Sequence, residues 1–305
     1  MKYRRLGKTN LRVSVIGMGT WQLGGEWGKN YTQAEVDPMF DAAREFGINL
    51  IDTAECYGDH TSESFVGSAI ARDREKWIVA TKFGHIFDGM FSRVDARTPA
   101  DVNKQVEASL KSLRTDYIDL LQYHSLPDVD FDNDALTDAL VALVKAGKVR
   151  HLGNSIGGKG NSEHQCSDSP NRHLETIQLI YNRLDRKPEE KILPICQALD
   201  LGVLARVPLA SGFLSGKYKP GATFDSSDTR SRKKQESRDE RLRQAQEIQQ
   251  TEVPPGVNMA QWTLAWCLKH PAISAVIPGC KDADQVKSNA AAVELMQPDH
   301  PQDWK

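Results

Sequence analysis

Four side chains suited to proton transfer are spaced along the first half of the chain: Asp52, Tyr57, Lys82 and His124. A free tyrosine is a weak acid at neutral pH, because its pKa is about 10. A neighbouring ammonium group stabilises the phenolate, and a carboxylate beyond it keeps the lysine charged. A neutral histidine can donate a hydrogen bond to a substrate oxygen that gains negative charge. Together these types fit reduction of a carbonyl group, in which hydride reaches carbon and an acid protonates oxygen.

Each of these residues also has a plain structural interpretation. An aspartate at a strand end can cap a helix, a tyrosine can line a barrel mouth, a lysine can simply pair with the aspartate, and a lone histidine is more often structural than catalytic. A second chemistry is also open, because a lysine at a strand end can act as a Schiff-base nucleophile. Asp52 argues against it, since a carboxylate favours the protonated amine and a Schiff base needs the free base.

Eight short apolar runs supply the elements that must position these residues. A longer segment with helical spacing follows each run, and the lack of strict alternation is typical of strands buried on both faces of a parallel sheet. The C-terminal ends of parallel barrel strands converge, so residues at those ends can meet. We therefore predict an α/β fold, a single (β/α)8 TIM barrel domain over residues 1–305. The runs are VIGMGTW (15–21), INLIDTA (48–54), WIVATKF (77–83), YIDLLQYH (117–124), VRHLGNSI (149–156), IQLIYN (177–182), GVLARVPL (202–209) and AISAVIPG (272–279).

Helical segments are predicted between the runs, with Thr or Asp near several starts and Gly near several ends. The one glycine-rich candidate for nucleotide binding, Gly17-Met18-Gly19, lacks the third glycine of the dinucleotide fingerprint, so we reject a Rossmann domain. Residues 3–16 predict an N-terminal β-hairpin that turns around Gly7 to Asn10 and plugs the barrel floor. The helical candidates are 32–47, 98–116, 132–147 and 187–202.

A long charged insertion, residues 222–250, follows the seventh run. Charge runs of this kind are usually a solvated helix or a disordered loop. The other interpretation is a flap over a bound cofactor, because the loops that leave the C-terminal face of a barrel build its active site. The sequence leaves both interpretations open.

Composition excludes several function classes. Lys+Arg number 39 and Asp+Glu 41, a net charge of −2, so no basic field would recruit nucleic acid. With 39% hydrophobic and 26% charged residues the chain is too polar for a membrane protein. Five scattered cysteines without a CxxC pair predict reduced thiols and no metal site. With no signal peptide at the N-terminus, we expect a cytoplasmic protein that binds a small molecule. Nothing indicates the oligomeric state.

The segment INLIDTAECYGDHTSESFVGSAI resembles the DTAxxYGxxxSExxxG signature of the aldo-keto reductase family. VATKFG resembles the family's motif around a catalytic lysine, and LLQYH resembles the motif around a catalytic histidine. The resemblance covers almost the whole chain. It implies an NADPH-dependent reductase of aldehydes and ketones with the tetrad Asp52, Tyr57, Lys82 and His124, in which Tyr57 is the general acid. It also implies that the cofactor lies extended across the C-terminal face of the barrel.

The resemblance also implies where the nicotinamide end of the cofactor binds. Ser155 and Gln178 stand at the positions that hold the carboxamide in the family. The asparagine expected after the serine is Ile156 here, so one polar contact is missing or comes from Asn154. Relatives often place an aromatic residue against the nicotinamide where this chain has Arg206. A guanidinium plane can lie against a ring, and we expect it to favour the neutral reduced cofactor over the positively charged oxidised form.

Two later segments resemble the family's phosphate sites. SGFLSGKY would bring small residues and a lysine to the pyrophosphate, although a simple tight turn is the alternative. IPGCKDADQVKSNAAA places Lys281 where the family binds the adenosine 2'-phosphate; alone, it would be an ordinary solvated lysine. Lysine lacks the fork of arginine, so the expected preference for NADPH is modest. The pyrophosphate candidates are Ser211, Gly212, Ser215 and Lys217, and the 2'-phosphate candidates are Gly279, Lys281, Gln285 and Asn289.

An apolar wall around the reacting carbonyl is expected from Trp21, Trp27, His85 and Phe87, which follow strand ends. The wall does not indicate which aldehyde or ketone is bound. Because the family also includes channel-associated subunits, an alternative function is an NADP(H)-binding redox sensor or accessory subunit with little turnover.

Overall fold

The structure is a computed structural model that describes residues 1–297 and 299–304. Its main sheet contains eight parallel strands, and the outermost two, β3 and β12, meet through bridges from Ile16 to Val276 and from Gly19 to Gly279. These contacts close the sheet, and each predicted run contains one strand, so the (β/α)8 barrel is confirmed. In spatial order the strands are β3 (Met18–Gly19), β4 (Leu50–Asp52), β5 (Ile78–Phe83), β8 (Ile118–His124), β9 (Val149–Ser155), β10 (Thr176–Ile180), β11 (Gly202–Arg206) and β12 (Ala275–Val276).

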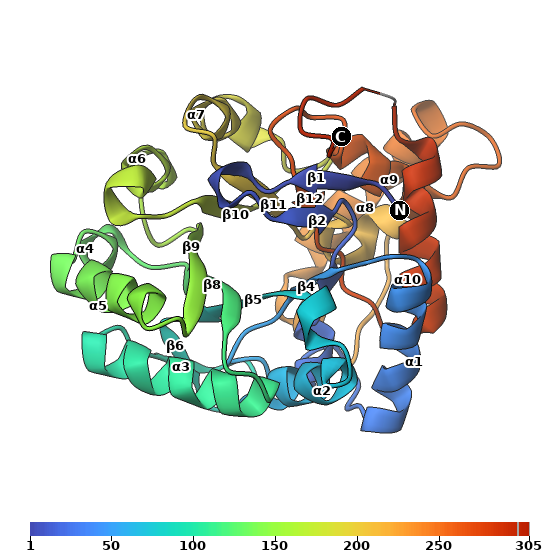
Figure 1. The fold of residues 1–305 in the computed structure, drawn as a ribbon. Coiled ribbons are helices and arrows are strands. Elements are labelled where there is room, and N and C mark those ends of the chain that lie inside the picture. Colours follow the sequence, from blue (N-terminus) through green and yellow to red (C-terminus); the bar gives the residue numbers. More distant parts are fainter. Residues whose placement is uncertain (298, 305) are drawn as a thin grey trace.

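Helices cover the outside of the barrel (Figure 1). The start of α3 shows how the sequence sets a boundary: Thr98 and Asp101 form a capping box, and Pro99 opens the first turn. The segment 187–202 is only partly α-helical, because a 3-10 turn at Lys187–Glu189 precedes α7. The helices are α1 (Gln33–Glu45), α2 (Thr61–Ile70), α3 (Pro99–Leu113), α4 (Asp128–Phe131), α5 (Asp134–Lys145), α6 (Ser162–Asp168), α7 (Ile192–Ala198), α8 (Gln235–Thr251), α9 (Met259–Cys267) and α10 (Ala283–Ala290).

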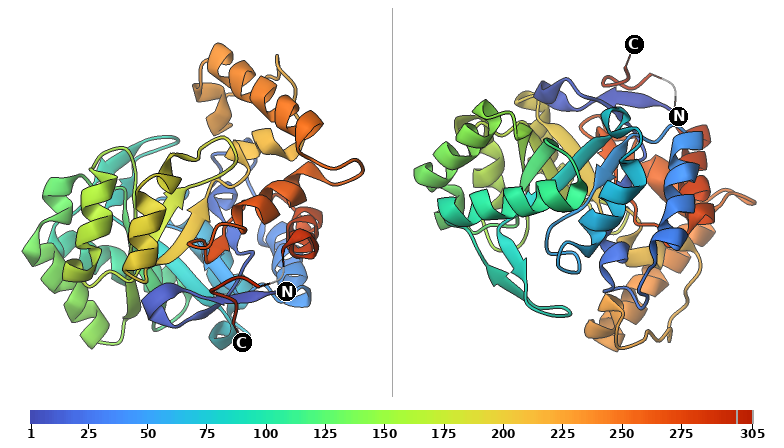
Figure 2. Two further views of the ribbon diagram at one scale, coloured as in Figure 1. Left: turned by 90° about the horizontal axis from the view of Figure 1, so that it is seen from above. Right: turned by 60° about the horizontal axis from the view of Figure 1, so that its bottom comes forward.

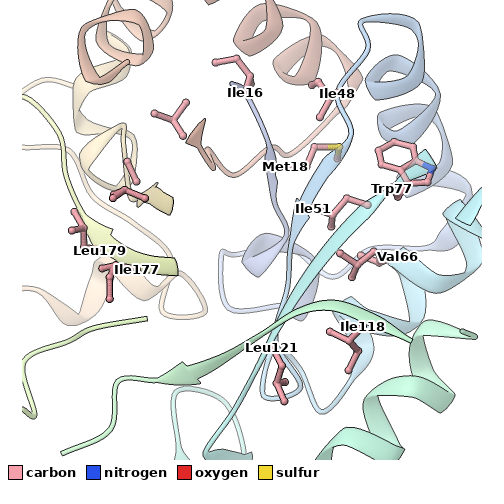
Figure 3. Packing of buried hydrophobic residues seen from close by; sticks show 14 of the residues in the cluster. Ile16, Met18, Ile48, Ile51, Val66, Trp77, Ile118, Leu121, Ile177 and Leu179 are labelled. Atoms are coloured by element: carbon pink, nitrogen blue, oxygen red, sulfur yellow. The ribbon is translucent and has the colours of Figure 1, made fainter. Parts of the chain in front are cut away.

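The largest apolar core includes residues between the barrel strands and the surrounding helices (Figure 3). Ile51 and Leu121, on strands of the barrel wall, belong to this core together with Val66 of α2 and Trp77. Full burial of an aliphatic side chain stabilises the fold by roughly 1.5–3 kcal/mol. Strand residues alternate in direction, so neighbours such as Asp52 face the barrel interior instead.

A β-hairpin closes the floor of the barrel, as predicted. Strands β1 (Tyr3–Arg5) and β2 (Arg12–Ser14) pair antiparallel around a turn that ends at Asn10 in the left-handed conformation, with φ of 54°. A Cβ atom on Gly7 would lie 2.1 Å from the backbone nitrogen of Gly202, so this close approach requires glycine. The hairpin packs Leu6 and Val13 into an inner apolar cluster that also contains Leu50, Ala80, Leu120, Leu204, Ala275 and Ile277.

Two extensions project from the other end of the barrel, as the right-hand view of Figure 2 shows. One is a second hairpin, β6 (His85–Phe87) with β7 (Arg93–Asp95), and the other is the long segment that ends in α8. This end carries the C-terminal ends of the strands, where barrel enzymes build their sites. None of the helices described here combines the length and apolar character needed to cross a bilayer.

Candidate active site

A cavity of about 690 Å³ opens at the C-terminal ends of the barrel strands. Asp52, Tyr57 and His124 line it, and Lys82 lies directly behind them with only 1% of its surface exposed. Asp52, Lys82 and His124 come from the ends of β4, β5 and β8, which are neighbours in the sheet. The structure therefore brings together all four residues that the sequence analysis grouped.

The contacts among the four residues form a chain from carboxylate to phenol. The Lys82 ammonium donates hydrogen bonds to Asp52 Oδ1 at 2.8 Å and to the Thr53 carbonyl oxygen at 2.7 Å. The same nitrogen lies 3.3 Å from the Tyr57 hydroxyl oxygen. The His124 ring is 6.1 Å from the Tyr57 ring, centre to centre, and nearly perpendicular to it. This arrangement leaves the phenol between the ammonium group and the cavity.

Glycines at two close approaches set the position of Tyr57 in the loop after β4. A Cβ on Gly24 would lie 2.6 Å from the Tyr57 carbonyl carbon, and a Cβ on Gly58 would lie 2.6 Å from the Gly24 carbonyl oxygen. Gly58 also has φ of 69°, which favours glycine. The loop is fixed further by Ser62, whose hydroxyl donates to the Thr20 carbonyl oxygen. Tyr57 is thus held against the loop that carries Trp21.

Burial and neighbouring charges set the protonation states of the site. Burial raises the pKa of Tyr57 to about 12, and the charge of Lys82 opposes that rise without reversing it. Lys82 thus eases proton loss, yet the pKa stays above that of free tyrosine, because burial outweighs the stabilisation of the phenolate that was expected from Lys82. Burial alone would lower the pKa of Lys82, but Asp52 and Tyr57 together outweigh it and the pKa is raised. Burial and Lys82 hold the pKa of His124 well below its ordinary value. Phenol and ammonium are therefore protonated at neutral pH, the imidazole is neutral, and the Schiff-base interpretation of Lys82 is disfavoured.

Two glutamines complete the contacts of Asp52. Gln178 Nε2 donates to Asp52 Oδ2 at 2.6 Å, and Gln122 Nε2 donates to the same oxygen at 3.3 Å. Ser155 Oγ donates to Gln178 Oε1 at 3.3 Å, so the two residues expected at the nicotinamide lie together. Gln122 was not identified from the sequence. The signal was available, since it stands two residues before His124 and faces the same side of the strand.

The expected substrate wall is only partly assembled. Trp21 stacks on Tyr57 with ring centres 6.0 Å apart, and Trp27 meets Trp21 edge-on at 5.2 Å. His85 also lines the cavity, with its ring centre 5.2 Å from that of His124. Phe87 lines a neighbouring smaller hollow instead, because it lies farther out along the β6–β7 hairpin.

An ion pair beside the wall was not predicted from the sequence. Glu26 is buried, accepts a hydrogen bond from Trp21 Nε1 at 2.8 Å, and pairs with the Arg93 guanidinium at 2.8 Å. Both Glu26 and Arg93 line the cavity. Glu26 lies in a loop and Arg93 starts β7 of a hairpin that the sequence pattern did not predict, so no signal in the sequence pointed to them.

Arg206 and Asn154, the two residues that depart from the usual nicotinamide positions, differ in where they face. Arg206 lines the cavity, its NH2 group donates to the Ile156 carbonyl oxygen at 3.2 Å, and its Nε has no partner among the described residues. Burial lowers its pKa from the ordinary value. Asn154 faces outward and donates to Gln165 of α6 at 3.1 Å. Asn154 therefore does not replace the polar contact that Ile156 lacks.

The expected pyrophosphate residues form a tight turn that also faces the cavity. Ser211, Gly212, Ser215 and Lys217 all line it. Ser211 and Gly212 have φ of 62° and 88°, and Ser215 Oγ donates to the Gly212 carbonyl oxygen at 2.6 Å. The turn explains the glycine at position 212, and its side chains remain beside the open space.

The residues expected at the 2'-phosphate line the same cavity, and a strap borders this cavity as well. Gly279, Lys281, Gln285 and Asn289 line the cavity, and Lys281 Nζ donates to the Trp27 carbonyl oxygen at 3.0 Å. The strap, residues 225–232, bridges to the loop before α1: the Gly28 N–H donates to the Ser227 carbonyl oxygen at 3.2 Å. The charged insertion therefore divides into a strap that borders the cavity and the largely exposed helix α8.

Arg230 on the strap is a cavity residue that the sequence did not single out. It is buried, pairs with Asp228 at 2.6 Å, and its guanidinium carbon lies 5.4 Å from the centre of the Trp27 ring. It lay within a run of charged residues that gave no reason to choose one member. Arg230 thus joins Lys217 and Lys281 among the cations that line the cavity.

Comparisons with known proteins agree with this architecture. The Aldo/keto reductase family matches residues 15–302 of the chain. An NADH-specific methylglyoxal reductase of Escherichia coli is 33% identical, over 97% of this chain and 94% of its own. The holo form of aldo-keto reductase AKR11C1 from Bacillus halodurans is 30% identical with a TM-score of 0.81, over 96% of this chain and 91% of its own. An aldo-keto reductase from Klebsiella pneumoniae in complex with NADPH is 26% identical with a TM-score of 0.72, over 97% and 91% of the two chains. The chain belongs to the aldo/keto reductase family of oxidoreductases.

Proposed function

We propose that the protein reduces an aldehyde or ketone to an alcohol, with NADPH as the source of hydride and Tyr57 as the proton donor. The observation that supports this most directly is the position of the Lys82 ammonium, 2.8 Å from Asp52 Oδ1 and 3.3 Å from the Tyr57 hydroxyl, at the edge of the cavity. Membership of a family suggests the type of reaction. The contacts among Asp52, Lys82 and Tyr57 support the proposal further, because these groups could transfer the proton.

Each residue has a distinct task in the proposed reaction. The Tyr57 hydroxyl gives its proton to the carbonyl oxygen, and the Lys82 ammonium stabilises the phenolate that remains. Asp52 holds Lys82 charged and oriented, and Gln122 and Gln178 hold Asp52. Neutral His124 donates a hydrogen bond to the same carbonyl oxygen and orients the substrate.

The cavity residues fit a nicotinamide cofactor, which would supply the hydride. Several buried polar atoms of cavity-lining residues, among them Gln22 Oε1, Trp27 Nε1 and Arg206 Nε, have no hydrogen-bond partner among the described residues. Ser155, Gln178 and Arg206 would hold the nicotinamide end. The turn from Ser211 to Lys217 would hold the pyrophosphate, through the small residues and charge described above.

Lys281 and Arg230 favour NADPH over NADH in this proposal. Both are cations that line the cavity, near the position where the family binds the adenosine 2'-phosphate. The strap would cover the cofactor there. Two nitrogens of the Arg230 guanidinium are already hydrogen-bonded to Asp228, so Lys281 carries most of the proposed preference and Arg230 adds to the positive charge nearby. The E. coli relative is named NADH-specific, so both cofactors must be tested on this chain.

A steady-state assay decides between a reductase and a cofactor-binding sensor or accessory subunit. The purified protein is incubated with NADPH or NADH and a panel of aliphatic, aromatic and sugar aldehydes and small ketones, and cofactor oxidation is followed by absorbance. We expect carbonyl-dependent oxidation, faster with NADPH at low cofactor concentration. Tight NADPH binding without turnover on any carbonyl would contradict the reductase and favour the sensor.

A further inference from the structure

Three potential metal ligands that the proposed reaction uses only in part meet beside the cavity. Glu55 and Cys56 lie three and four residues after the end of β4, and His124 ends β8. A carboxylate oxygen, the Cys56 sulfur and a His124 ring nitrogen all lie within 4.8 Å of one another. The Cys56 Sγ to His124 Nδ1 distance is 3.7 Å. The strands β4 and β8 lie on either side of β5. The loop after β4 and the end of β8 therefore bring three different types of metal ligand close together.

Glu55 is the unexplained member of this group. Its side chain is 3% exposed, and neither carboxylate oxygen has a hydrogen-bond partner among the described residues. Buried polar groups without partners are costly and uncommon. Asp52, three residues earlier in the chain, is by contrast hydrogen-bonded to Lys82 and to two glutamines. A cation bound beside Cys56 would supply the partner that Glu55 lacks.

The donor set points to zinc. Thiolate, imidazole and carboxylate are the three ligand types that Zn²⁺ takes in proteins, with Zn–S of about 2.3 Å and Zn–N of about 2.0–2.1 Å. In a tetrahedral site those bond lengths place sulfur and nitrogen roughly 3.6 Å apart, and the Cys56–His124 separation is 3.7 Å. Three protein ligands would leave the fourth position to water from the cavity. We propose that Glu55, Cys56 and His124 form a Zn²⁺-binding site.

Zinc at this site would inhibit carbonyl reduction, a consequence that rests on the proposed function. The ion would tie His124 to the loop of Cys56 and place a divalent charge beside Tyr57. Substrate orientation by the imidazole and proton transfer from the phenol both depend on the space next to these groups. Zinc binding itself can be measured without turnover, so it does not depend on the proposed function.

Metal binding is tested on the tag-free protein with Zn²⁺ by calorimetry and with Co²⁺ by absorption. We expect one ion per chain and a thiolate-to-cobalt charge-transfer band in the near ultraviolet. Cys56→Ser should abolish the band, and both Cys56→Ser and Glu55→Gln should weaken Zn²⁺ binding at least tenfold. Cys267→Ala is the matched control, because Cys267 is buried away from the cavity and should leave band and affinity unchanged.

Absence of the cobalt band, or equal Zn²⁺ affinity in Cys56→Ser, Glu55→Gln and the Cys267→Ala control, would overturn the site. A second arm measures turnover with and without Zn²⁺, each variant compared with its own metal-free rate. We expect Zn²⁺ to inhibit the wild type at concentrations that leave Cys56→Ser active. A protein that binds zinc through Cys56 yet reduces no carbonyl would support the metal site and contradict the proposed function.

Discussion

The floor and the mouth of the barrel are built by the same strands with opposite chemistry. At the floor, inward-facing side chains are apolar and form one cluster with the hairpin residues Leu6 and Val13. Two positions farther along four strands, the inward side chain is polar or charged and belongs to the site. The pairs are Leu50 and Asp52, Ala80 and Lys82, Leu120 and Gln122, and Leu204 and Arg206.

This contrast shows how a barrel separates stability from chemistry. Apolar layers contribute burial and close packing, whereas the ion pair of Lys82 and Asp52 is kept out of water at a desolvation cost. A strand that alternates by two residues moves from one layer to the next within about 7 Å. Variants in the floor should therefore change stability and leave turnover nearly intact. Variants in the mouth should lower turnover, and they should lower stability as well where they leave a buried charge without its partner.

The largest expected effect comes from Lys82→Met, which leaves the buried Asp52 carboxylate without its cation. The free energy of unfolding should fall by about 3–5 kcal/mol, measured by urea denaturation. The double variant Asp52→Asn/Lys82→Met removes both charges and should recover most of that loss while turnover stays low. A double variant no more stable than the single one, or one that regains turnover, would show that the pair does not act as described.

Leu120→Ala makes the complementary change in the floor, one inward position from Gln122. Removing a fully buried leucine should lower the free energy of unfolding by about 2–5 kcal/mol. Turnover per folded molecule should remain close to that of the wild type, because the mouth contacts are untouched. A large loss of turnover per folded molecule would contradict the proposed division of roles between floor and mouth.

Lys281→Ala sharpens the comparison inside the mouth, between the two ends of the proposed cofactor site. Loss of a charged hydrogen-bond donor costs about 1.5–3 kcal/mol, which corresponds to a rise of roughly ten- to a hundredfold in the Kd for NADPH. The Kd for NADH, measured by fluorescence titration in the same variant, serves as the control and should change little. Equal losses for both cofactors would refute a role at the 2'-phosphate.

A smaller effect concerns a charge pair near the start of β5, on the floor side. Hydrogen bonds from Arg44 hold the pKa of Asp73 down at about 2, and the Trp77 indole adds a further donor. A depressed carboxyl pKa stabilises the fold above the unfolded pKa of about 3.9, and that stabilisation is lost as the pH falls toward 2. The stability difference between wild type and Asp73→Asn should therefore shrink from pH 5 to pH 2. A constant difference in urea unfolding across that range would contradict this.

Most of the fold followed from the sequence because strands buried on both faces produce unbroken apolar runs. All eight runs contain a strand, although β3 and β12 have only two residues each, since their neighbours bond through isolated bridges. Chain direction then places Asp52, Lys82 and His124 at one end of the barrel. The apolar pattern thus locates each strand, and the direction of the chain determines which end of the strand faces the site.

The remaining features depend on contacts between loops, which have no periodic pattern. Phe87 was expected in the wall, but the unpredicted β6–β7 hairpin carries it to a neighbouring hollow. A flap within residues 222–250 was one of two open interpretations. The bridge between Trp27 and Asp228 joins loops about 200 residues apart, so local sequence could not show which part borders the cavity or single out Arg230. The pKa of Tyr57 was anticipated from one neighbour, whereas burial dominates it.

The central claim is tested most directly by single-turnover oxidation of bound NADPH in wild type and Tyr57→Phe at saturating carbonyl. Phenylalanine keeps the ring against Trp21 and removes only the hydroxyl beside Lys82. We predict that the rate falls by about 10²- to 10⁴-fold while the Kd for NADPH stays nearly constant. A Tyr57→Phe rate close to that of the wild type would contradict the assignment of the phenol as proton donor.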